Sequence, residues 1–199
     1  MVSGSIMEKI KLTTNYIYKT NVLQSNNDQL IEEMINASEK FKSDEISNIG
    51  GWQSDKLSKY NNKFPHMSQF VYNMYDDLID YCAELNSDKK YFIANIWGNL
   101  NKKGHYNLLH SHGDADIVGC YYVQMPEDPA PIIILDGDVL HNLYFKTGDL
   151  VIFDGKLSHA VEPNLSDADR ISLAFNILKI KQTKRKRFKM AWTKREVPD

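Results

Sequence analysis

The spacing of hydrophobic residues along the chain changes near residue 90. Before this point, apolar residues recur three and four positions apart, a pattern typical of amphipathic helices. One such stretch covers residues 30–41, with Asn27 or Asp28 available as its N-terminal cap, and a second covers about residues 67–85. We therefore expect residues 1–90 to form a mainly helical cover.

After residue 90 the pattern becomes one of short apolar runs separated by turn residues. Glycines in 136–138 and 147–149 provide two good turn signals. Several short strands at such spacing predict a β-sandwich or barrel, so the fold class is mainly β with flanking helices. The expected strands are residues 91–97, 117–125, 132–135, 150–153 and 171–180.

Composition narrows the class of protein. At 199 residues, with 42% hydrophobic and 25% charged residues, the chain suits one globular domain. We divide this single domain, residues 1–199, into a helical cover (1–90), a β core (91–180) and a basic tail (181–199). Basic residues crowd this tail although the net charge is only -2, and we expect a solvated surface segment there rather than a nucleic-acid site.

Cysteine content and hydropathy bear on location. Cys82 and Cys120 are too few for a disulfide framework or a structural zinc site. We therefore expect a reducing, cytoplasmic environment. No apolar run approaches the roughly twenty residues that a membrane helix needs, so no membrane association is predicted.

Three histidines suggest a metal site. His110 and His112 are two residues apart, and in an extended segment such residues point to the same side, as would Asp114. Barrel closure can bring His159, which follows a later strand, to the same point. Three protein ligands would leave coordination positions open for oxygen chemistry.

The segment after His159 adds a second candidate group. In the last strand, Ile171, Leu173, Phe175 and Ile177 alternate with Arg170, Ser172, Ala174 and Asn176. If the second set faces inward, the planar guanidinium of Arg170 can pair with a carboxylate and Ser172 can add a hydroxyl. If it faces outward, this set is only a solvated strand face.

These motifs together resemble those of the Fe(II)/2-oxoglutarate-dependent dioxygenase superfamily: a His-x-Asp/Glu, a distal His and an Arg about ten residues later. Residues 107–122, with His110-Ser111-His112, resemble more narrowly a group of small 2-oxoglutarate oxygenases of bacteria and phages that carry His-x-His. Their Gly-Gly-Trp-Gln-Ser loop is matched by residues 50–54, and their Gly-Asp-Leu-x-x-Phe strand by residues 148–153. The resemblance covers about residues 45–178 and implies a double-stranded β-helix, the cupin-like jelly roll.

The ligand set has two registers. In the favoured one, His110, His112 and His159 bind the metal, and His112 occupies the place where the superfamily has a carboxylate. In the other, His112 and Asp114 form an ordinary His-x-Asp, so Asp114 replaces His110. His66, His105 and His141 are expected not to be ligands.

The resemblance implies Fe(II) and 2-oxoglutarate as cofactors, with decarboxylation of 2-oxoglutarate coupled to hydroxylation of a substrate. Arg170 with Ser172 would then pair with the distal carboxylate of 2-oxoglutarate. Tyr122, or its neighbour Tyr121, could also bind that carboxylate, and Asn107 could line the site.

The expected partners are O2 and a small-molecule or peptide substrate, and a homodimer is open because small oxygenases of this kind are often dimers. Two alternatives remain. One is a cupin-like metal enzyme that does not use 2-oxoglutarate, against which Arg170 and Ser172 argue. The other is a non-catalytic jelly-roll binding module, which absence of bound metal would favour.

Overall fold

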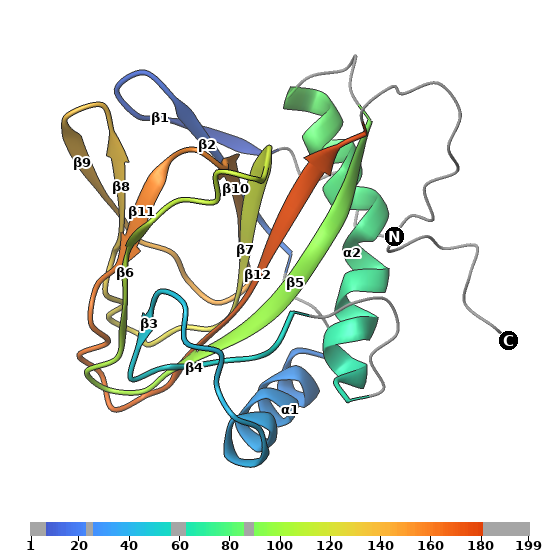
Figure 1. Ribbon diagram of the computed structural model, residues 1–199, viewed down its shortest axis with the longest axis vertical. Coiled ribbons are helices and arrows are strands. Elements are labelled where there is room, and N and C mark those ends of the chain that lie inside the picture. The colour runs from blue at the N-terminus through green and yellow to red at the C-terminus, as the bar shows by residue number, and fades with distance from the viewer. Residues whose placement is uncertain (1–6, 23–25, 57–62, 86–89, 181–199) are drawn as a thin grey trace, which may run out of the picture.

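Two facing antiparallel β-sheets form the centre of the protein, seen here in a computed structural model that describes residues 7–22, 26–56, 63–85 and 90–180 (Figure 1). The larger sheet consists, in spatial order, of β1 (Glu8–Lys11), β2 (Tyr16–Asn21), β10 (Asp149–Asp154), β7 (Ile117–Gln124), β12 (Arg170–Lys179), β5 (Tyr91–Asn101) and β4 (Trp52–Gln53). The smaller sheet consists of β3 (Asn48–Ile49), β6 (Tyr106–His110), β11 (Ser158–Val161), β8 (Ile132–Asp136) and β9 (Val139–Leu143). The predicted mainly-β jelly roll is confirmed, as two facing sheets rather than a closed barrel.

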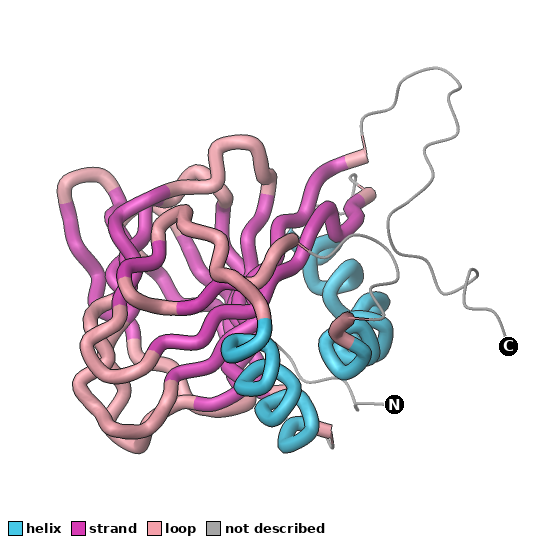
Figure 2. Tube along the Cα trace, turned by 60° about the horizontal axis from the view of Figure 1, so that its bottom comes forward, coloured by secondary structure: helices cyan, strands magenta, loops and turns pink. Residues whose placement is uncertain are grey.

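Two helices, α1 (Asn27–Lys40) and α2 (Pro65–Leu85), cover the outer face of the larger sheet (Figures 1 and 2). They lie close to the two expected stretches. Their apolar faces pack on alternate residues of β5 and β12, because side chains two apart in a strand share a face. The fully buried members of this cluster include Leu30, Met34, Phe70, Leu78, Ile93, Leu173 and Phe175.

The expected cap of α1 is wrong. The N-cap position is Asn26, and it makes no side-chain capping bond. Asn27, the first helical residue, instead turns its side chain toward β7, where its Nδ2 donates to the carbonyl of Val123 (2.7 Å) and its Oδ1 accepts from the hydroxyl of Tyr121 (2.8 Å). A long-range bond to the sheet has replaced the local one that the sequence suggested.

Residues 1–90 are also less helical than expected, because four strands lie within the described part of this segment. β2 pairs with β10 and β1 extends the sheet by pairing with β2. β3 and β4 flank Gly50, whose positive φ of 73° allows the tight reversal between the two sheets. These strands are short and lie at or near sheet edges, so they lack the long alternating pattern that identifies a strand in a sequence.

The inner faces of the two sheets form a second apolar cluster. It includes Val118, Ile134, Val151 and Phe153, and its residues come from both sheets. This cluster leaves a cavity between the sheets, which the candidate site occupies. In the described part of the chain, neither helix is long and apolar enough to cross a membrane.

Candidate metal centre and cosubstrate pocket

A cavity of about 340 Å³ lies between the two sheets and is lined by all three candidate histidines. The inward residues of β12, namely Arg170, Ser172, Ala174 and Asn176, line it from the larger sheet. The polar face of this strand therefore points into the cavity and not into solvent, as a functional role of Arg170 and Ser172 requires.

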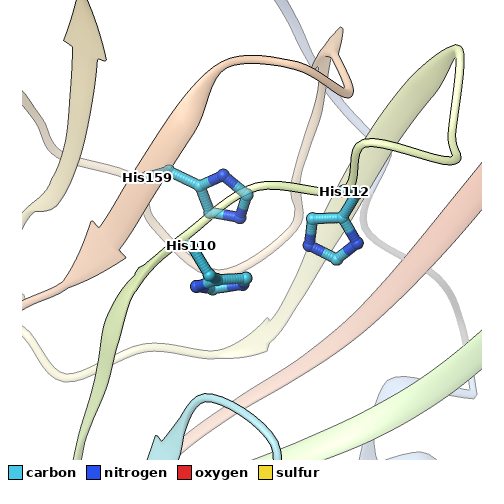
Figure 3. A group of neighbouring side chains, drawn as sticks. All are labelled: His110, His112 and His159. Atoms are coloured by element: carbon cyan, nitrogen blue, oxygen red, sulfur yellow. The ribbon is translucent and has the colours of Figure 1, made fainter.

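The histidines reach one point from two paired strands and the loop after one of them. His110 ends β6 and lies directly opposite His159 of β11. His112 lies two residues beyond the end of β6, and Figure 3 shows the three rings facing a shared space. Each ring offers a nitrogen, and these three atoms lie within 4.8 Å of one another, close enough to hold one metal ion.

A β-bulge helps to place His110. Between the pairs His159–His110 and Val161–Asn107, β11 advances by two residues and β6 by three. The extra residue lets both Asn107 and His110 face the cavity although they are three positions apart. The sequence argument used the two-residue spacing of His110 and His112 and did not anticipate this irregularity.

Backbone carbonyls fix two of the rings. Nδ1–H of His110 donates to the carbonyl of Leu108 (2.7 Å), and Nδ1–H of His159 donates to the carbonyl of Leu157 (3.0 Å). Each bond selects the tautomer in which Nε2 carries a lone pair. Nε2 of His110 also lies 3.5 Å from the hydroxyl of Ser47, a long contact that a bound metal would replace.

Burial keeps two of the ligand candidates, His112 and His159, neutral. It lowers the pKa of His159 to about 3 and that of His112 to about 4, and repulsion from His110 adds to both effects. Uncharged imidazoles retain the lone pair that a metal binds. The donor set therefore fits a divalent metal such as Fe(II), for which imidazole is a suitable ligand.

Asp114 lies apart from this cluster. It is exposed at the rim of the cavity, and the described group of potential ligands contains His110, His112 and His159 without it. The arrangement favours the first of the two registers.

Arg170 lies buried in the cavity wall, with 4% of its surface exposed. Two of its guanidinium nitrogens donate to the carbonyls of Glu162 (2.9 Å) and His105 (3.3 Å). These bonds hold the guanidinium in place, and other N–H groups remain to bind an anion in the cavity. Ser172 follows on the same strand face and also lines the cavity.

Tyr122 and Tyr121 point to opposite sides of β7. Tyr122 lines the cavity beside Cys120, and its buried hydroxyl has no hydrogen-bond partner. Tyr121 points to the helices, where it stacks on Phe70 with ring centroids 4.4 Å apart. An unpaired buried hydroxyl costs free energy unless a ligand satisfies it, so Tyr122 is the candidate that the geometry favours.

Asn107 lines the cavity, but its side chain is already engaged. Its Oδ1 accepts from Nδ2 of Asn101 (3.2 Å), and its Nδ2 donates to the hydroxyl of Ser47 (3.3 Å). Because Ser47 reaches His110, this chain of hydrogen bonds supports the metal site more directly than it supports a cosubstrate.

The histidines expected not to be ligands lie elsewhere. The backbone carbonyl of His105 accepts a hydrogen bond from Arg170, and the ring of His141 on β9 hydrogen-bonds with Thr13 in the turn between β1 and β2.

The sequence argument missed Trp97, whose indole stacks on His112 with centroids 5.7 Å apart and planes 18° apart. A strand tryptophan is usually a core residue, and nothing in its spacing pointed to the site.

Comparisons with known proteins agree with this geometry. A family model described as putative 2OG-Fe(II) oxygenase, where 2OG is 2-oxoglutarate, matches residues 135–176, a stretch that contains His159, Arg170 and Ser172. No curated protein matches the chain.

Solved structures share the fold at low sequence identity. A Pseudomonas putida prolyl-4-hydroxylase has a TM-score of 0.60 at 15% identity, covering 82% of this chain and 93% of its own. A Trichoplax adhaerens prolyl hydroxylase, solved with a peptide of hypoxia inducible factor, has a TM-score of 0.66 at 12% identity, covering 81% and 83%. HygX from Streptomyces hygroscopicus, solved with nickel and 2-oxoglutarate, has a TM-score of 0.62 at 11% identity, covering 89% and 85%.

The fold and the histidine cluster define a jelly-roll protein with three histidines that could hold one metal ion. The family model covers about a fifth of the chain, residues 135–176, and its description agrees with the resemblance found in the sequence. The predicted enzyme class and the cofactors Fe(II) and 2-oxoglutarate are likewise those that the family description names.

Proposed function

We propose that this protein is a non-haem Fe(II) oxygenase that couples oxidative decarboxylation of 2-oxoglutarate to hydroxylation of a substrate. The observation that carries the proposal is the meeting, in one cavity, of three clustered imidazoles with a buried guanidinium and an unpaired tyrosine hydroxyl. A metal site alone would suit many jelly-roll proteins. The additional anion site supports use of a dicarboxylate cosubstrate.

In this proposal His110, His112 and His159 hold Fe(II), and Arg170, Ser172 and Tyr122 hold the distal carboxylate of 2-oxoglutarate. When bound, iron and 2-oxoglutarate would supply the oxidation: one atom of O2 would enter succinate as 2-oxoglutarate loses CO2, and the other would enter the substrate as its new hydroxyl. The protein's own residues orient both groups and exclude water from a cavity with largely buried walls. Asn107 lines the site and supports Ser47 beside His110.

The proposed ligand set has no carboxylate. Its metal site would therefore carry one more positive charge than the usual centre of two histidines and one carboxylate. Comparing His110→Ala with Asp114→Ala tests this choice. We expect metal binding to be lost in His110→Ala and kept in Asp114→Ala. The reverse result would assign the third ligand to Asp114.

The central experiment is an anaerobic titration of Fe(II) and 2-oxoglutarate into the purified protein. We expect a visible charge-transfer band, succinate formation on admission of O2, and loss of both in His159→Ala. His141→Ala is the matched control, because His141 lies on the β8–β9 hairpin away from the cavity and should leave the band unchanged. A wild-type protein that gives neither band nor succinate would contradict the proposal and favour a non-catalytic binding module.

The substrate we propose is a small molecule or a peptide, in keeping with the family. A cytoplasmic location is supported by Cys82 and Cys120, both free thiols in the structure. The single-domain organisation and the homodimer remain predictions, and the basic tail, residues 181–199, lies outside the described residues.

A further inference from the structure

The three candidate ligands are not held in the same way. His110 and His159 each donate Nδ1–H to the carbonyl two residues earlier. His112 lies past the end of β6, and within the described structure no carbonyl of its own segment takes this part. A ring without such a bond can rotate and change tautomer, which would weaken it as a ligand.

Two side chains of the larger sheet line the cavity wall that His112 faces. The indole of Trp97 on β5 lies nearly parallel to the His112 ring, and only 7% of the surface of Trp97 is exposed. Trp97 faces Ala174 of β12 across the strand pair, and Asn176 is two residues further along β12 on the same face. The two side chains therefore approach His112 from adjacent strands.

Asn176 has an acceptor to offer. Its Oδ1 is buried and has no hydrogen-bond partner in the structure, although an unpaired buried carbonyl oxygen costs free energy. Asn176 lines the same cavity as His112, and it lies on the strand beside Trp97, which stacks on the His112 ring. A ring N–H of His112 is thus a candidate donor for this oxygen.

We propose that Asn176 and Trp97 are positioning residues that fix His112 as a metal ligand. Asn176 accepts a hydrogen bond from one ring nitrogen, which leaves the lone pair of the other nitrogen for the metal, and Trp97 sets the plane of the ring. The inference rests on the proposed function in one respect, that His112 binds the metal. It adds an outer set of residues for a histidine that occupies the position where the superfamily has a carboxylate.

The choice of an amide has a physical reason. A carboxylate ligand needs no tautomer, whereas an imidazole in the same place needs an acceptor for its N–H. A neutral amide meets this need without adding a buried negative charge, while a carboxylate at the same position would make the ring a stronger ligand.

Binding of Co2+ to the full chain, followed by its visible spectrum and by competition with a chelator, tests the proposal without any turnover. We expect Asn176→Leu to weaken Co2+ binding about 10- to 100-fold, the usual effect of removing such an outer partner, and Asn176→Asp to keep or tighten it. Trp97→Leu should also weaken binding, and Trp97→Phe, which keeps an aromatic face, should restore most of it.

Asn99→Leu is the matched control. Asn99 is another carboxamide on the cavity wall, opposite Ser172 on the neighbouring strand, and its loss should leave Co2+ affinity unchanged. Thermal unfolding of each metal-free variant separates loss of the site from loss of the fold. If Asn176→Leu does not fold, the Asp variant and the Trp97 pair still decide the question.

Three results would overturn the inference: wild-type affinity in Asn176→Leu, an equal loss in the Asp and Leu variants, or an equal loss in Asn99→Leu. Absence of Co2+ binding by the wild-type protein would instead contradict the proposed function itself. The two failures are therefore distinguishable.

Discussion

The backbone N–H of His112 donates a 2.8 Å hydrogen bond to the carbonyl of Gly155, on the turn between β10 and β11. The carbonyl of His112 in turn accepts from the N–H of Ala115 (2.7 Å). A Cβ added to Gly155 would lie 2.3 Å from the carbonyl oxygen of Ala115 and 3.0 Å from that of His112. The loop that carries one ligand candidate is therefore packed on the turn that precedes another.

This packing predicts that Gly155→Ala displaces His112. Because both clashing atoms are backbone carbonyls, the loop must move as a whole. We expect Co2+ or Fe(II) affinity to fall by at least about tenfold, comparable with the loss of an outer partner of a ligand. Gly113→Ala in the same loop is the control, since a Cβ there meets no atom within 4 Å. Equal metal affinity in the two variants would show that the turn does not set the position of His112.

Arg170 gives a prediction for the cosubstrate. Arg170→Ala removes the buried cation proposed to pair with the distal carboxylate, and each charge-assisted hydrogen bond contributes about 1.5–3 kcal/mol. The dissociation constant for 2-oxoglutarate, measured from the charge-transfer band, should rise at least about tenfold, because 1.4 kcal/mol corresponds to a factor of ten.

A matched control for Arg170 is Lys103→Ala. Lys103 is an exposed cation whose 2.8 Å ion pair with Asp167 lies outside the cavity, and its removal should not change the dissociation constant. If Arg170→Ala bound 2-oxoglutarate as tightly as the wild-type protein, Arg170 would not be the residue that pairs with the distal carboxylate.

The two tyrosines of β7 should respond in opposite ways to the loss of their hydroxyls. The Tyr122 hydroxyl has no partner, so Tyr122→Phe should stabilise the cofactor-free protein by about 1 kcal/mol, the cost of leaving such a group unpaired. The same change should weaken 2-oxoglutarate binding. Tyr121→Phe loses the bond to Asn27 and should lower the free energy of unfolding by about 1 kcal/mol without affecting the cosubstrate.

Chemical denaturation without ligand and the 2-oxoglutarate titration measure the two effects on these tyrosine variants separately. If 2-oxoglutarate bound more weakly to Tyr121→Phe, or bound to Tyr122→Phe as tightly as to the wild-type protein, the assignment of the two residues would be wrong.

Local pattern was enough to predict some parts of the site. The alternation of residues 170–177 predicted which side chains share a face, and the strand before His159 was expected at nearly its observed place. Both are properties of a single segment, because a strand repeats every two residues whatever its partners are.

Other parts depend on contacts between distant segments. Trp97 lies beside His112 because β5 of the larger sheet and the loop after β6 of the smaller sheet border the same cavity. His110 faces inward through a bulge that exists only relative to β11. Asn27 looks like a helix cap in the sequence, yet it bonds to Tyr121 across 94 positions. No local spacing encodes such relationships. The sequence therefore favoured His110 over Asp114 only through the resemblance to proteins that carry His-x-His.

Asp136 provides a prediction about stability and pH. This residue ends β8, is 1% exposed, and receives bonds from the turn between β1 and β2. These bonds join the β1–β2 hairpin of the larger sheet to the β8–β9 hairpin of the smaller sheet. The carboxylate of Asp136 accepts from the backbone N–H groups of Thr14 (2.6 Å) and Asn15 (2.9 Å) and from both of their side chains.

These bonds, the Thr14 hydroxyl first, hold the pKa of Asp136 well below its usual value. A carboxyl with a depressed pKa in the folded state stabilises the protein above its unfolded pKa of about 3.9, and this contribution is lost as pH falls toward the folded value. Asp136→Asn should therefore lower the free energy of unfolding most above about pH 5 and progressively less as the wild-type carboxylate is protonated. Urea unfolding of both proteins from neutral to acid pH measures this difference, with Asp138→Asn in the adjacent β8–β9 turn as the control. A difference that stayed constant across the whole pH range would show that the charge of Asp136 does not provide the stabilisation.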